Sequence, residues 1–311
     1  MSSRVVVVGS LNLDTVYRVL SLPARGQTIA AHRSDQCVGG KGGNQALAAS
    51  AAGSPVVMVG CVGKDAAGHR IVDDLSAGGV DVQRIARADA ATGEALVVVS
   101  DDAENHILVV AGANDELGAA SLETHLADLN PGDVVLLQNE IPAATTARAA
   151  SIARDKGASV IWNAAPAPAD RAEIPSDLDV VIVNEGELRS LADVLELPSG
   201  SGNLIDRLAR LLGVTVVCTL GADGALLSDG HERTVHPAPR VQAVDTTAAG
   251  DTFTGYYAAL AHLPQTERLA WATAAGAQAV TRAGASPSIP TRAQVAPLVP
   301  HFAVQHAGGT P

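Results

Sequence analysis

Three small residues and an aspartate stand together near the C-terminus, where the chain reads Ala248, Ala249, Gly250 and Asp251. An apolar run at 256–263 predicts that a helix begins here, and the first backbone N–H groups of a helix bind anions. A carboxylate able to take a proton from a hydroxyl would then lie beside amides able to hold a transferring phosphate. This pairing suits phosphoryl transfer to an alcohol, and the alternative is an ordinary helix cap.

A second glycine-rich segment, 39–44, contains Lys41 and Asn44 and precedes an alanine-rich helix expected at 45–52. The glycines let a ligand approach the backbone, while the lysine and the asparagine supply a charge and an amide for hydroxyls or phosphate. The glycine spacing and the missing Lys-Ser/Thr pair exclude a Walker A loop.

Apolar runs predict the strands that position these segments. Val5–Val8 indicates a strand buried on both faces of a parallel sheet, and Asn12 and Asp14 follow its carboxyl end. Ligands bind at that edge of open α/β sheets, so both residues are candidate substrate contacts, with a solvated turn as the alternative. Further strands are expected at 56–63, 134–137, 159–162, 180–183 and 214–219.

Polar residues follow several of the later strands. Each of them alone is consistent with a helix cap, but together they place acidic and amide groups along one edge of the sheet. These residues are Asn139, Glu140, Asn163, Asn184, Glu185, Glu187 and the segment 221–224.

The segment 92–110 differs from its surroundings because two apolar runs, 95–99 and 107–110, flank a polar turn without an intervening helix. This pattern predicts a hairpin that forms a small sheet together with residues 15–36. We interpret the sheet as a lid at about 13–37 and 92–111 of a single domain spanning 1–311. An edge strand of the main sheet is the alternative.

The composition limits the classes of function. The chain has 311 residues, of which 47% are hydrophobic, so it is a globular protein. Its net charge of -12 argues against nucleic-acid and anionic-membrane partners, and no stretch of about 18 apolar residues predicts a membrane span. Cys37, Cys61 and Cys218 lack metal-type spacing and predict reduced thiols in a cytoplasmic protein.

Five ordered motifs resemble the ribokinase family of sugar kinases over nearly the whole chain. They lie at 9–14 (GSLNLD), 39–44 (GGKGGN), 184–187 (NEGE), 219–224 (TLGADG) and 245–253 (DTTAAGDTF). The resemblance implies a three-layer α/β/α ribokinase-like fold with a central, mostly parallel sheet and a small β-sheet lid. It also implies transfer of the ATP γ-phosphate to the 5-hydroxyl of D-ribose.

The same resemblance implies roles for particular residues. Asp251 would be the base, and residues 248–250 would form the anion hole. Ribose contacts are implied for Asn12, Asp14, Gly40, Lys41, Asn44, Glu140 and Asp251. Nucleotide contacts are implied for Asn184, Thr219, Leu220, Gly221, Ala222, Asp223, Gly224, Gly250 and Asp251.

Two metal ions and a homodimer are also expected. Glu187 would organise Mg²⁺ through water, and matching positions in ribokinases bind K⁺, mostly through main-chain oxygen. The K⁺ positions are Asp245, Thr247, Ala279, Arg282, Gly284 and Ser288. Because a small sheet with apolar residues on both sides invites edge pairing, we expect two lids to form the dimer contact.

Two departures from the family pattern leave the sugar open. Asn139 precedes Glu140 where an apolar residue is usual, and Asn163-Ala-Ala-Pro-Ala-Pro replaces a plainer Asn-Pro-Ala-Pro. Deoxyribose, a nucleoside or a ketose are therefore alternative acceptors. A sugar-binding or regulatory protein without catalysis is the alternative of a different class.

Overall fold

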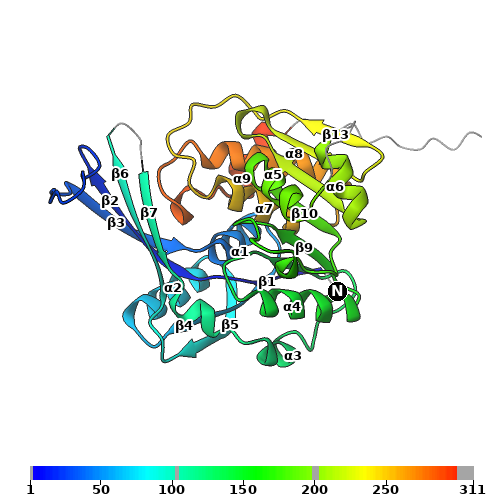
Figure 1. Ribbon diagram of the computed structural model, residues 1–311, viewed down its shortest axis with the longest axis horizontal. Coiled ribbons are helices and arrows are strands. Elements are labelled where there is room, and N and C mark those ends of the chain that lie inside the picture. The colour runs from blue at the N-terminus through cyan, green and yellow to red at the C-terminus, as the bar shows by residue number, and fades with distance from the viewer. Residues whose placement is uncertain (1–2, 102–104, 198–202, 300–311) are drawn as a thin grey trace, which may run out of the picture.

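A nine-stranded sheet forms the centre of the computed structural model, which describes residues 3–101, 105–197 and 203–299 (Figure 1). In spatial order its strands are β13 (Arg233–His236), β12 (Ala225–Ser228), β11 (Thr215–Thr219), β10 (Val180–Asn184), β9 (Ser159–Asn163), β8 (Val134–Leu137), β1 (Val5–Val8), β4 (Val56–Gly63) and β5 (Val80–Ala88). The strands from β11 to β5 run parallel, whereas β12 and β13 add an antiparallel hairpin at one edge.

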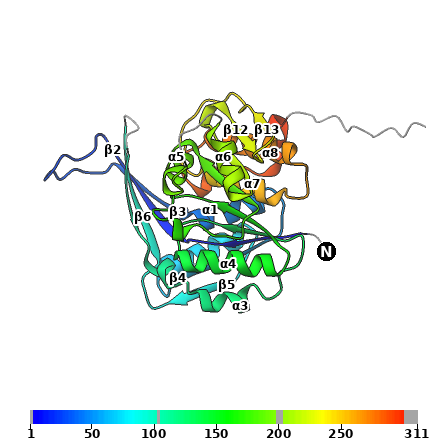
Figure 2. The same cartoon turned by 45° about the vertical axis from the view of Figure 1, so that its right-hand side comes forward.

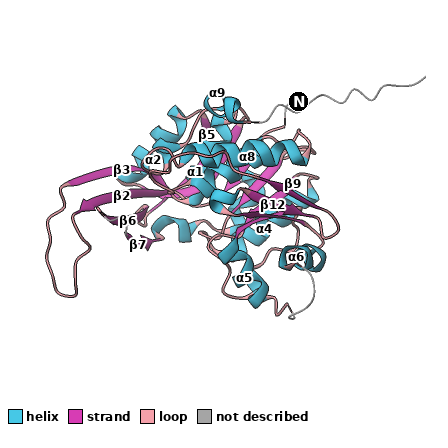
Figure 3. Ribbon diagram, turned by 90° about the horizontal axis from the view of Figure 1, so that it is seen from above, coloured by secondary structure: helices cyan, strands magenta, loops and turns pink. Residues whose placement is uncertain are grey.

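Helices cover both faces of this sheet, and β1 shows why. Because successive side chains of a strand point to opposite faces, Val5 and Val7 enter one hydrophobic core while Val6 and Val8 enter the other. The first core is closed by α1 (Lys41–Ala51), α2 (Ala66–Ala77), α7 (Ala249–Ala259), α8 (Gln265–Ala279) and α9 (Arg292–Val295). The second is closed by α3 (Leu122–His125), α4 (Ala143–Asp155), α5 (Glu185–Val194) and α6 (Leu204–Leu212). The three layers are visible from above (Figure 3).

A separate four-stranded sheet stands off the three-layer body (Figure 2). Its order is β3 (Arg33–Gly39), β2 (Asn12–Val19), β6 (Gly93–Ser100) and β7 (Asn105–Val110). β2 follows β1 after a short connection, so the base of this sheet adjoins the carboxyl end of β1. The expected hairpin is confirmed as the antiparallel pair β6 and β7. The alternative of an edge strand in the main sheet is wrong, because neither strand pairs with it.

The predicted strands of the main sheet are confirmed with shifts of about one residue at their ends. Three strands were not expected: β5, whose polar and apolar residues are mixed, and the four-residue strands β12 and β13, of which β13 forms the edge of the sheet. The alanine-rich helix begins earlier than predicted, at Lys41, which places Lys41 and Asn44 in its first turn. In the described part of the chain, no helix combines the length and apolarity that crossing a membrane requires.

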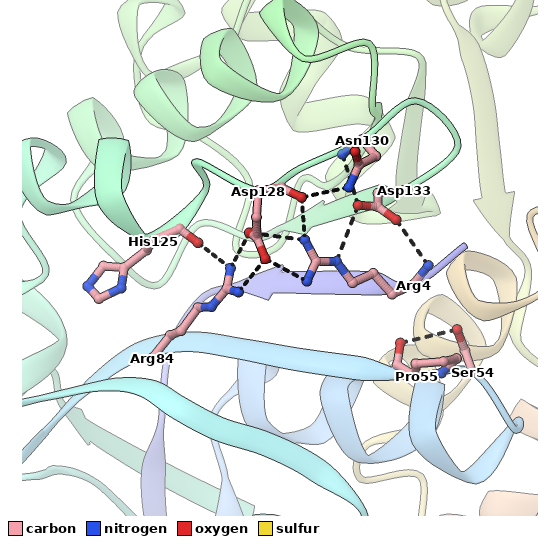
Figure 4. A network of polar contacts seen from close by, with 8 residues as sticks. All are labelled: Arg4, Ser54, Pro55, Arg84, His125, Asp128, Asn130 and Asp133. Carbon is pink, nitrogen blue, oxygen red and sulfur yellow. Dashed lines mark hydrogen bonds and ion pairs between the residues drawn. The ribbon is translucent and has the colours of Figure 1, made fainter. Parts of the chain in front are cut away.

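A charged cluster ties the amino ends of β1 and β8 to β5 (Figure 4). Arg4 donates from Nε to Asp133 Oδ2 (3.2 Å) and from Nη1 to Asp128 Oδ2 (3.1 Å). Arg84 on β5 holds the same Asp128 carboxylate with two hydrogen bonds of 2.8 and 2.7 Å. These bonds connect three segments that are far apart in the sequence.

Candidate functional site

The predicted polar edge of the sheet is present in the structure. β1 pairs with β4 on one side and with β8 on the other, so the chain leaves β1 at a topological switch point of a parallel sheet. Ligands of open α/β folds bind outside the carboxyl ends of strands at such a point. The segments that follow β1, β8, β9 and β10 meet there with the N-terminal ends of α1 and α7.

The base of the four-stranded sheet contributes Asn12 and Asp14. Asn12 Oδ1 accepts a hydrogen bond from Asn114 Nδ2 (2.8 Å), while Asn114 Oδ1 accepts from the Leu11 backbone N–H (2.8 Å). This bond fixes the orientation of the Asn12 amide. It uses the Oδ1 atom of Asn12 and does not involve its Nδ2 group. The sequence gives no signal for this role of Asn114, because it requires the fold to bring together residues 102 positions apart.

Asp14 is held in an unusual state. Its Oδ1 atom is buried and has no hydrogen-bond partner among the described residues. Burial, together with the charges of Glu140 and Asp251, raises the pKa of this carboxyl group to about 7. Gly39 faces it, and a Cβ atom there would lie 2.0 Å from Asp14 Cγ. An unpartnered buried acceptor is costly, so this oxygen is suited to receive a donor from a ligand.

Glu140 lies beside the first turn of α1. Its Oε2 atom accepts from Ser10 Oγ (2.6 Å) and from the Lys41 backbone N–H (2.9 Å), and its Oε1 atom lies 3.8 Å from Lys41 Nζ. Burial alone would lower the Lys41 pKa, but the negative charges of Asp251, Glu140 and Glu187 outweigh it and raise that pKa. Lys41 therefore stays a cation among several carboxylates.

The glycines of 39–44 serve close packing of the protein's own backbone. A Cβ at Gly42 would lie 2.6 Å from the Ser10 carbonyl oxygen, and one at Gly40 would lie 2.9 Å from the Asn12 backbone nitrogen. Gly40 also has a φ of 74°, a left-handed value that glycine tolerates best. The space that these glycines leave is filled by residues 10–12, which seats α1 directly on the end of β1.

Asp251 lies where α7 meets α1. Its Oδ2 atom accepts from Asn44 Nδ2 (2.9 Å), and its Oδ1 atom accepts from Gln45 Nε2 (2.9 Å). Burial raises the pKa of the Asp251 carboxyl group, while the charge of Lys41 and the two amide donors oppose that rise. A carboxylate with this balance is suited to accept a proton from a hydroxyl.

The N-terminus of α7 presents backbone amides beside this carboxylate. Ala248 has a φ of 57° and forms the N-cap, so the chain turns sharply into the helix. The N–H groups of Gly250 and Asp251 are in the first turn, which supplies no intrahelical acceptor, whereas the Ala249 N–H donates to the Thr246 carbonyl (3.3 Å). A Cβ at Gly250 would meet no atom within 4 Å, so an anion has access here.

A pocket joins Asp251 to the segments after β9, β10 and β11. Its lining residues are Lys41, Asn163, Ala165, Ile182, Val183, Asn184, Glu187, Thr219, Ala248, Gly250, Asp251 and Thr254. Asn184 and Glu187 form a reciprocal cap at the start of α5, with bonds of 2.8 Å in both directions. The capping alternative is thus true of their backbone contacts, yet both side chains also border the pocket. Burial raises the Glu187 pKa.

The segment after β11 is only partly in this pocket. Thr219 lines it, whereas the pocket lining does not include 220–224. These residues form a turn in which Gly221 and Gly224 have φ values of 57° and 104°. A Cβ at Gly224 would lie 2.0 Å from the His236 carbonyl oxygen, so this glycine lets the turn pack against the end of β13.

The segment before α7 contacts the loop after α8, the two segments to which the family resemblance assigns K⁺ positions. Asp245 Oδ2 accepts from the Gly284 backbone N–H (2.9 Å), and Oδ1 accepts from Thr247 N–H (2.9 Å) and Oγ1 (2.6 Å). Burial would raise the Asp245 pKa, but these bonds outweigh it and lower that pKa. Ser288 lies buried in the same loop and donates to the Ala285 carbonyl.

The remaining predicted positions of this loop contribute main-chain atoms. The Ala279 carbonyl accepts from the Arg282 backbone N–H (3.1 Å), and the Arg282 side chain is exposed.

The two departures from the family pattern, Asn139 and the segment 163–168, contact each other. Asn139 accepts from Trp162 Nε1 (2.8 Å) and donates to the Pro166 carbonyl (2.9 Å), so it braces the segment after β9.

Comparisons with known proteins agree with this geometry. Residues 2–292 match the pfkB family carbohydrate kinases. The chain is 33% identical over 305 residues to ribokinase from Haemophilus influenzae, covering 97% of this chain and 100% of that one. The crystal structure of ribokinase from Thermotoga maritima superposes with a TM-score of 0.86 at 33% identity, covering 95% and 99% of the two chains.

A second solved structure contains ligands. Arabidopsis thaliana ribokinase complexed with ribose and ATP superposes with a TM-score of 0.83 at 32% identity, covering 96% of this chain and 99% of that one. The family match spans the fold and every segment of the site. This chain therefore belongs to the pfkB family of carbohydrate kinases.

Proposed function

We propose that this kinase transfers the γ-phosphate of ATP to the 5-hydroxyl of D-ribose. The observation that carries the proposal is the position of Asp251, which contacts Asn44 on the side of Asp14 and Glu140 and lines the pocket shared by Asn184, Glu187 and Thr219. The relatives called ribokinase, one of them complexed with ribose and ATP, support ribose and ATP as the substrates.

In the proposed reaction the sugar lies against the base of the four-stranded sheet. The unpartnered Oδ1 atom of Asp14 accepts a sugar hydroxyl, and Asn12, Gly40, Lys41, Asn44 and Glu140 supply the surrounding contacts. Asp251 takes the proton of the 5-hydroxyl as its oxygen attacks the γ-phosphorus and the bond to the β-phosphate oxygen breaks. The start of α7 at positions 248–250, where the Gly250 N–H has no intrahelical acceptor, holds the charge of the transferring phosphate.

The nucleotide occupies the other half of the pocket in this proposal. Asn184 faces the phosphates and Thr219 borders the pocket, while Leu220, Gly221, Ala222, Asp223 and Gly224 extend the proposed nucleotide cleft beyond the lining of that pocket. Among the described residues no three His, Cys, Asp or Glu side chains form a metal cluster. Glu187, whose carboxylate borders the pocket, would order water on Mg²⁺ held by the ATP phosphates. Mg²⁺ would neutralise charge on the phosphates.

We also propose a monovalent cation, K⁺, at the loop that contacts Asp245. Backbone oxygens suit a large, weakly hydrated cation, and the contacts of Asp245 with Thr247 and Gly284 bring two backbone segments together. Ala279, Arg282, Gly284 and Ser288 then surround the ion mostly through main-chain oxygen. Because the loop adjoins α7, the ion acts by ordering residues 248–250.

The four-stranded sheet is proposed to be both a lid and a homodimer contact. Its edge strand β7 exposes four consecutive apolar residues, Ile107, Leu108, Val109 and Val110, each more than half exposed. An unpaired edge with such residues is a template for pairing with a second copy. The lid comprises about 13–37 and 92–111.

We also propose that the protein is cytoplasmic. The three free cysteines are consistent with this proposal.

The proposal is tested by measuring ADP release with ATP and one acceptor at a time: ribose, deoxyribose, fructose and adenosine. We expect the highest kcat/KM with ribose and a product phosphorylated at the 5-position by NMR. A higher kcat/KM with another acceptor would contradict the assignment of ribose. Sugar binding by calorimetry without ADP release from any acceptor would instead indicate the non-catalytic alternative.

A further inference from the structure

Two glutamines lie behind Asp251, on the side away from the pocket. Gln45 and Gln138 are both 0% exposed, and neither lines the pocket that contains Asp251. Gln45 Nε2 donates to Asp251 Oδ1 (2.9 Å), and Gln138 Nε2 donates to Gln45 Oε1 (2.7 Å). The two amides form a chain that ends on the proposed base. Both are buried and outside the pocket lining, so they contact the proposed base and each other and do not face the pocket.

The direction of the hydrogen bonds in this chain is fixed by a backbone carbonyl next to it. Asn163 Nδ2 donates to the Ile182 backbone carbonyl (3.0 Å), which can only accept. Asn163 Oδ1 must then face Gln45, and it accepts from Gln45 Nε2 (2.9 Å). Gln45 therefore presents its NH₂ group to both Asn163 and Asp251, while its carbonyl oxygen takes the donor of Gln138. Reversing the Gln45 amide would break all three bonds.

We infer that Gln45, oriented by Gln138 and Asn163, is a positioning residue that holds Asp251 as an ionised acceptor aimed at the substrate hydroxyl. The inference rests on the proposed function, in which Asp251 is the base. A carboxylate accepts from an NH₂ group, whereas a protonated carboxyl oxygen would direct its hydrogen at another donor. The amide chain thus selects one charge state and one orientation of Asp251.

Gln45 differs in this respect from its neighbour Asn44. Asn44 also donates to Asp251, but its Oδ1 atom is buried without a partner among the described residues, and it lies on the sugar side of the site. All polar atoms of the Gln45 side chain are already used within the protein. Loss of Gln45 should therefore change turnover and its pH dependence, whereas loss of Asn44 should also weaken sugar binding.

The test uses Gln45→Met, which keeps the length of the side chain and removes its hydrogen bonds. A hydrogen bond to a charged group corresponds to about a 10- to 100-fold change, so we expect kcat to fall by that factor at neutral pH. The acidic limb of the kcat profile should move to higher pH, because the buried carboxyl group loses a donor that favours its charged form. KM for sugar and for ATP should stay within about 2-fold of wild type.

Two further variants grade the effect. Gln45→Glu places a second carboxyl group against Asp251, so it should raise the pKa of the pair and lower kcat more than Gln45→Met does. Gln138→Met leaves Gln45 in place but removes the donor that orients it, so its kcat should lie between wild type and Gln45→Met. An unchanged kcat for Gln138→Met would overturn the part assigned to Gln138.

Thr145→Val is the matched control. Thr145 is 1% exposed and donates to the Leu117 carbonyl (2.6 Å), so its replacement removes a buried hydrogen bond on the opposite face of the sheet. The control should lower the melting temperature and leave the pH profile of kcat unchanged. Folded Gln45→Met with the wild-type kcat and profile, or a Thr145→Val profile shifted by the same amount, would overturn the inference.

Failure of the proposed function gives a different result. Wild-type enzyme that releases no ADP with any acceptor contradicts the function, and the position of Gln45 is then judged without turnover. The pKa of Asp251 is measured by NMR of ¹³C-labelled aspartate, with the resonance assigned by its loss in Asp251→Asn. A higher pKa in Gln45→Met than in wild type and Thr145→Val supports the inference, and equal values overturn it.

Discussion

The two ends of the main sheet treat their carboxylates in opposite ways. At the amino ends, Asp128 is bonded by two guanidinium groups, from Arg84 and Arg4, and these bonds lower its pKa (Figure 4). At the carboxyl ends, burial raises the pKa of Asp14 and Asp251, and Asp14 Oδ1 has no partner among the described residues. Paired charges serve to join segments, whereas a crowded, under-paired set is costly to the fold and is characteristic of a binding site.

Removing the proposed base should have the largest effect on turnover. Asp251→Asn keeps the shape of the side chain and should keep the sugar KM within about 2-fold, while kcat falls by about 10²- to 10⁴-fold. Steady-state kinetics with ribose and ATP measure both values. A variant with more than about a tenth of wild-type turnover would show that Asp251 is not the general base.

Replacing Lys41 or Glu140 tests whether these two residues contact the sugar and not ATP. Glu140→Gln should raise the sugar KM by about 10-fold or more, because a charged acceptor beside Lys41 is lost, with little effect on the ATP KM. Lys41→Met should raise the sugar KM and also lower kcat, since Lys41 lines the pocket together with Asn184 and Glu187. An ATP KM that rises while the sugar KM is constant contradicts this division.

The raised pKa of Asp14 should make sugar use depend on pH. A sugar hydroxyl donates more strongly to Asp14 when that group is a carboxylate, so kcat/KM for ribose should fall as pH decreases through about 7. Asp14→Asn should lower kcat/KM and flatten this acidic limb. For the fold the sign is opposite: a raised pKa gives stability that is complete below about pH 4 and is lost as pH rises through about 7.

The proposed cation loop contains Asp245, which lies near the carboxyl ends of the strands but has a lowered pKa, like Asp128 at the amino ends. Hydrogen bonds from Thr247 and Gly284 lower the Asp245 pKa, although the residue lies near the active edge. In Tris buffer with constant Mg²⁺, adding KCl should raise kcat several-fold over tetramethylammonium chloride at matched ionic strength, because the ion orders 248–250. Asp245→Ala should remove that response, and equal rates with both salts would contradict the K⁺ site.

The sequence predicted the central strands because their signal is strong and local. Val5–Val8 is a continuous β-branched run buried on both faces, and no tertiary information is needed to recognise it. β12 and β13 were missed because β12 has only four residues and β13 is a partly exposed edge strand with charged and polar residues. The turn at 229–232 joins them, and Gly224, just before β12, packs closely on the His236 carbonyl at the end of β13.

The candidate site was predictable where chemistry and an element boundary coincide in the sequence. Asn12 and Asp14 follow a strand, and Asp251 begins a helix, so each stood out. Gln45 and Gln138 did not, because a glutamine in a helix or after a strand is ordinary. Their alignment depends on contacts between residues 93 and 206 positions apart, which only the fold establishes.

The smallest expected effect lies at the other end of the sheet. Asp128→Asn should lower the free energy of unfolding by about 1 kcal/mol at neutral pH, since the carboxylate is 52% exposed and water screens its ion pairs. Its lowered pKa makes this contribution complete above about pH 4 and progressively lost as pH falls from there through the lowered pKa, so the difference from wild type should shrink in acid. Urea unfolding at several pH values measures it.

Asp74→Asn is the control, because Asp74 forms a single ion pair with Arg70 within α2 at 3.5 Å and is similarly exposed. Its effect should be no more than a few tenths of a kcal/mol, about the value of one i,i+4 pair. Both variants should keep wild-type kcat and KM. If Asp128→Asn lowers kcat while the fold is intact, the amino ends of the sheet influence catalysis, and the division between a bonding end and a reacting end is wrong. If it costs no more stability than Asp74→Asn at neutral pH, two guanidinium partners stabilise the carboxylate no better than one.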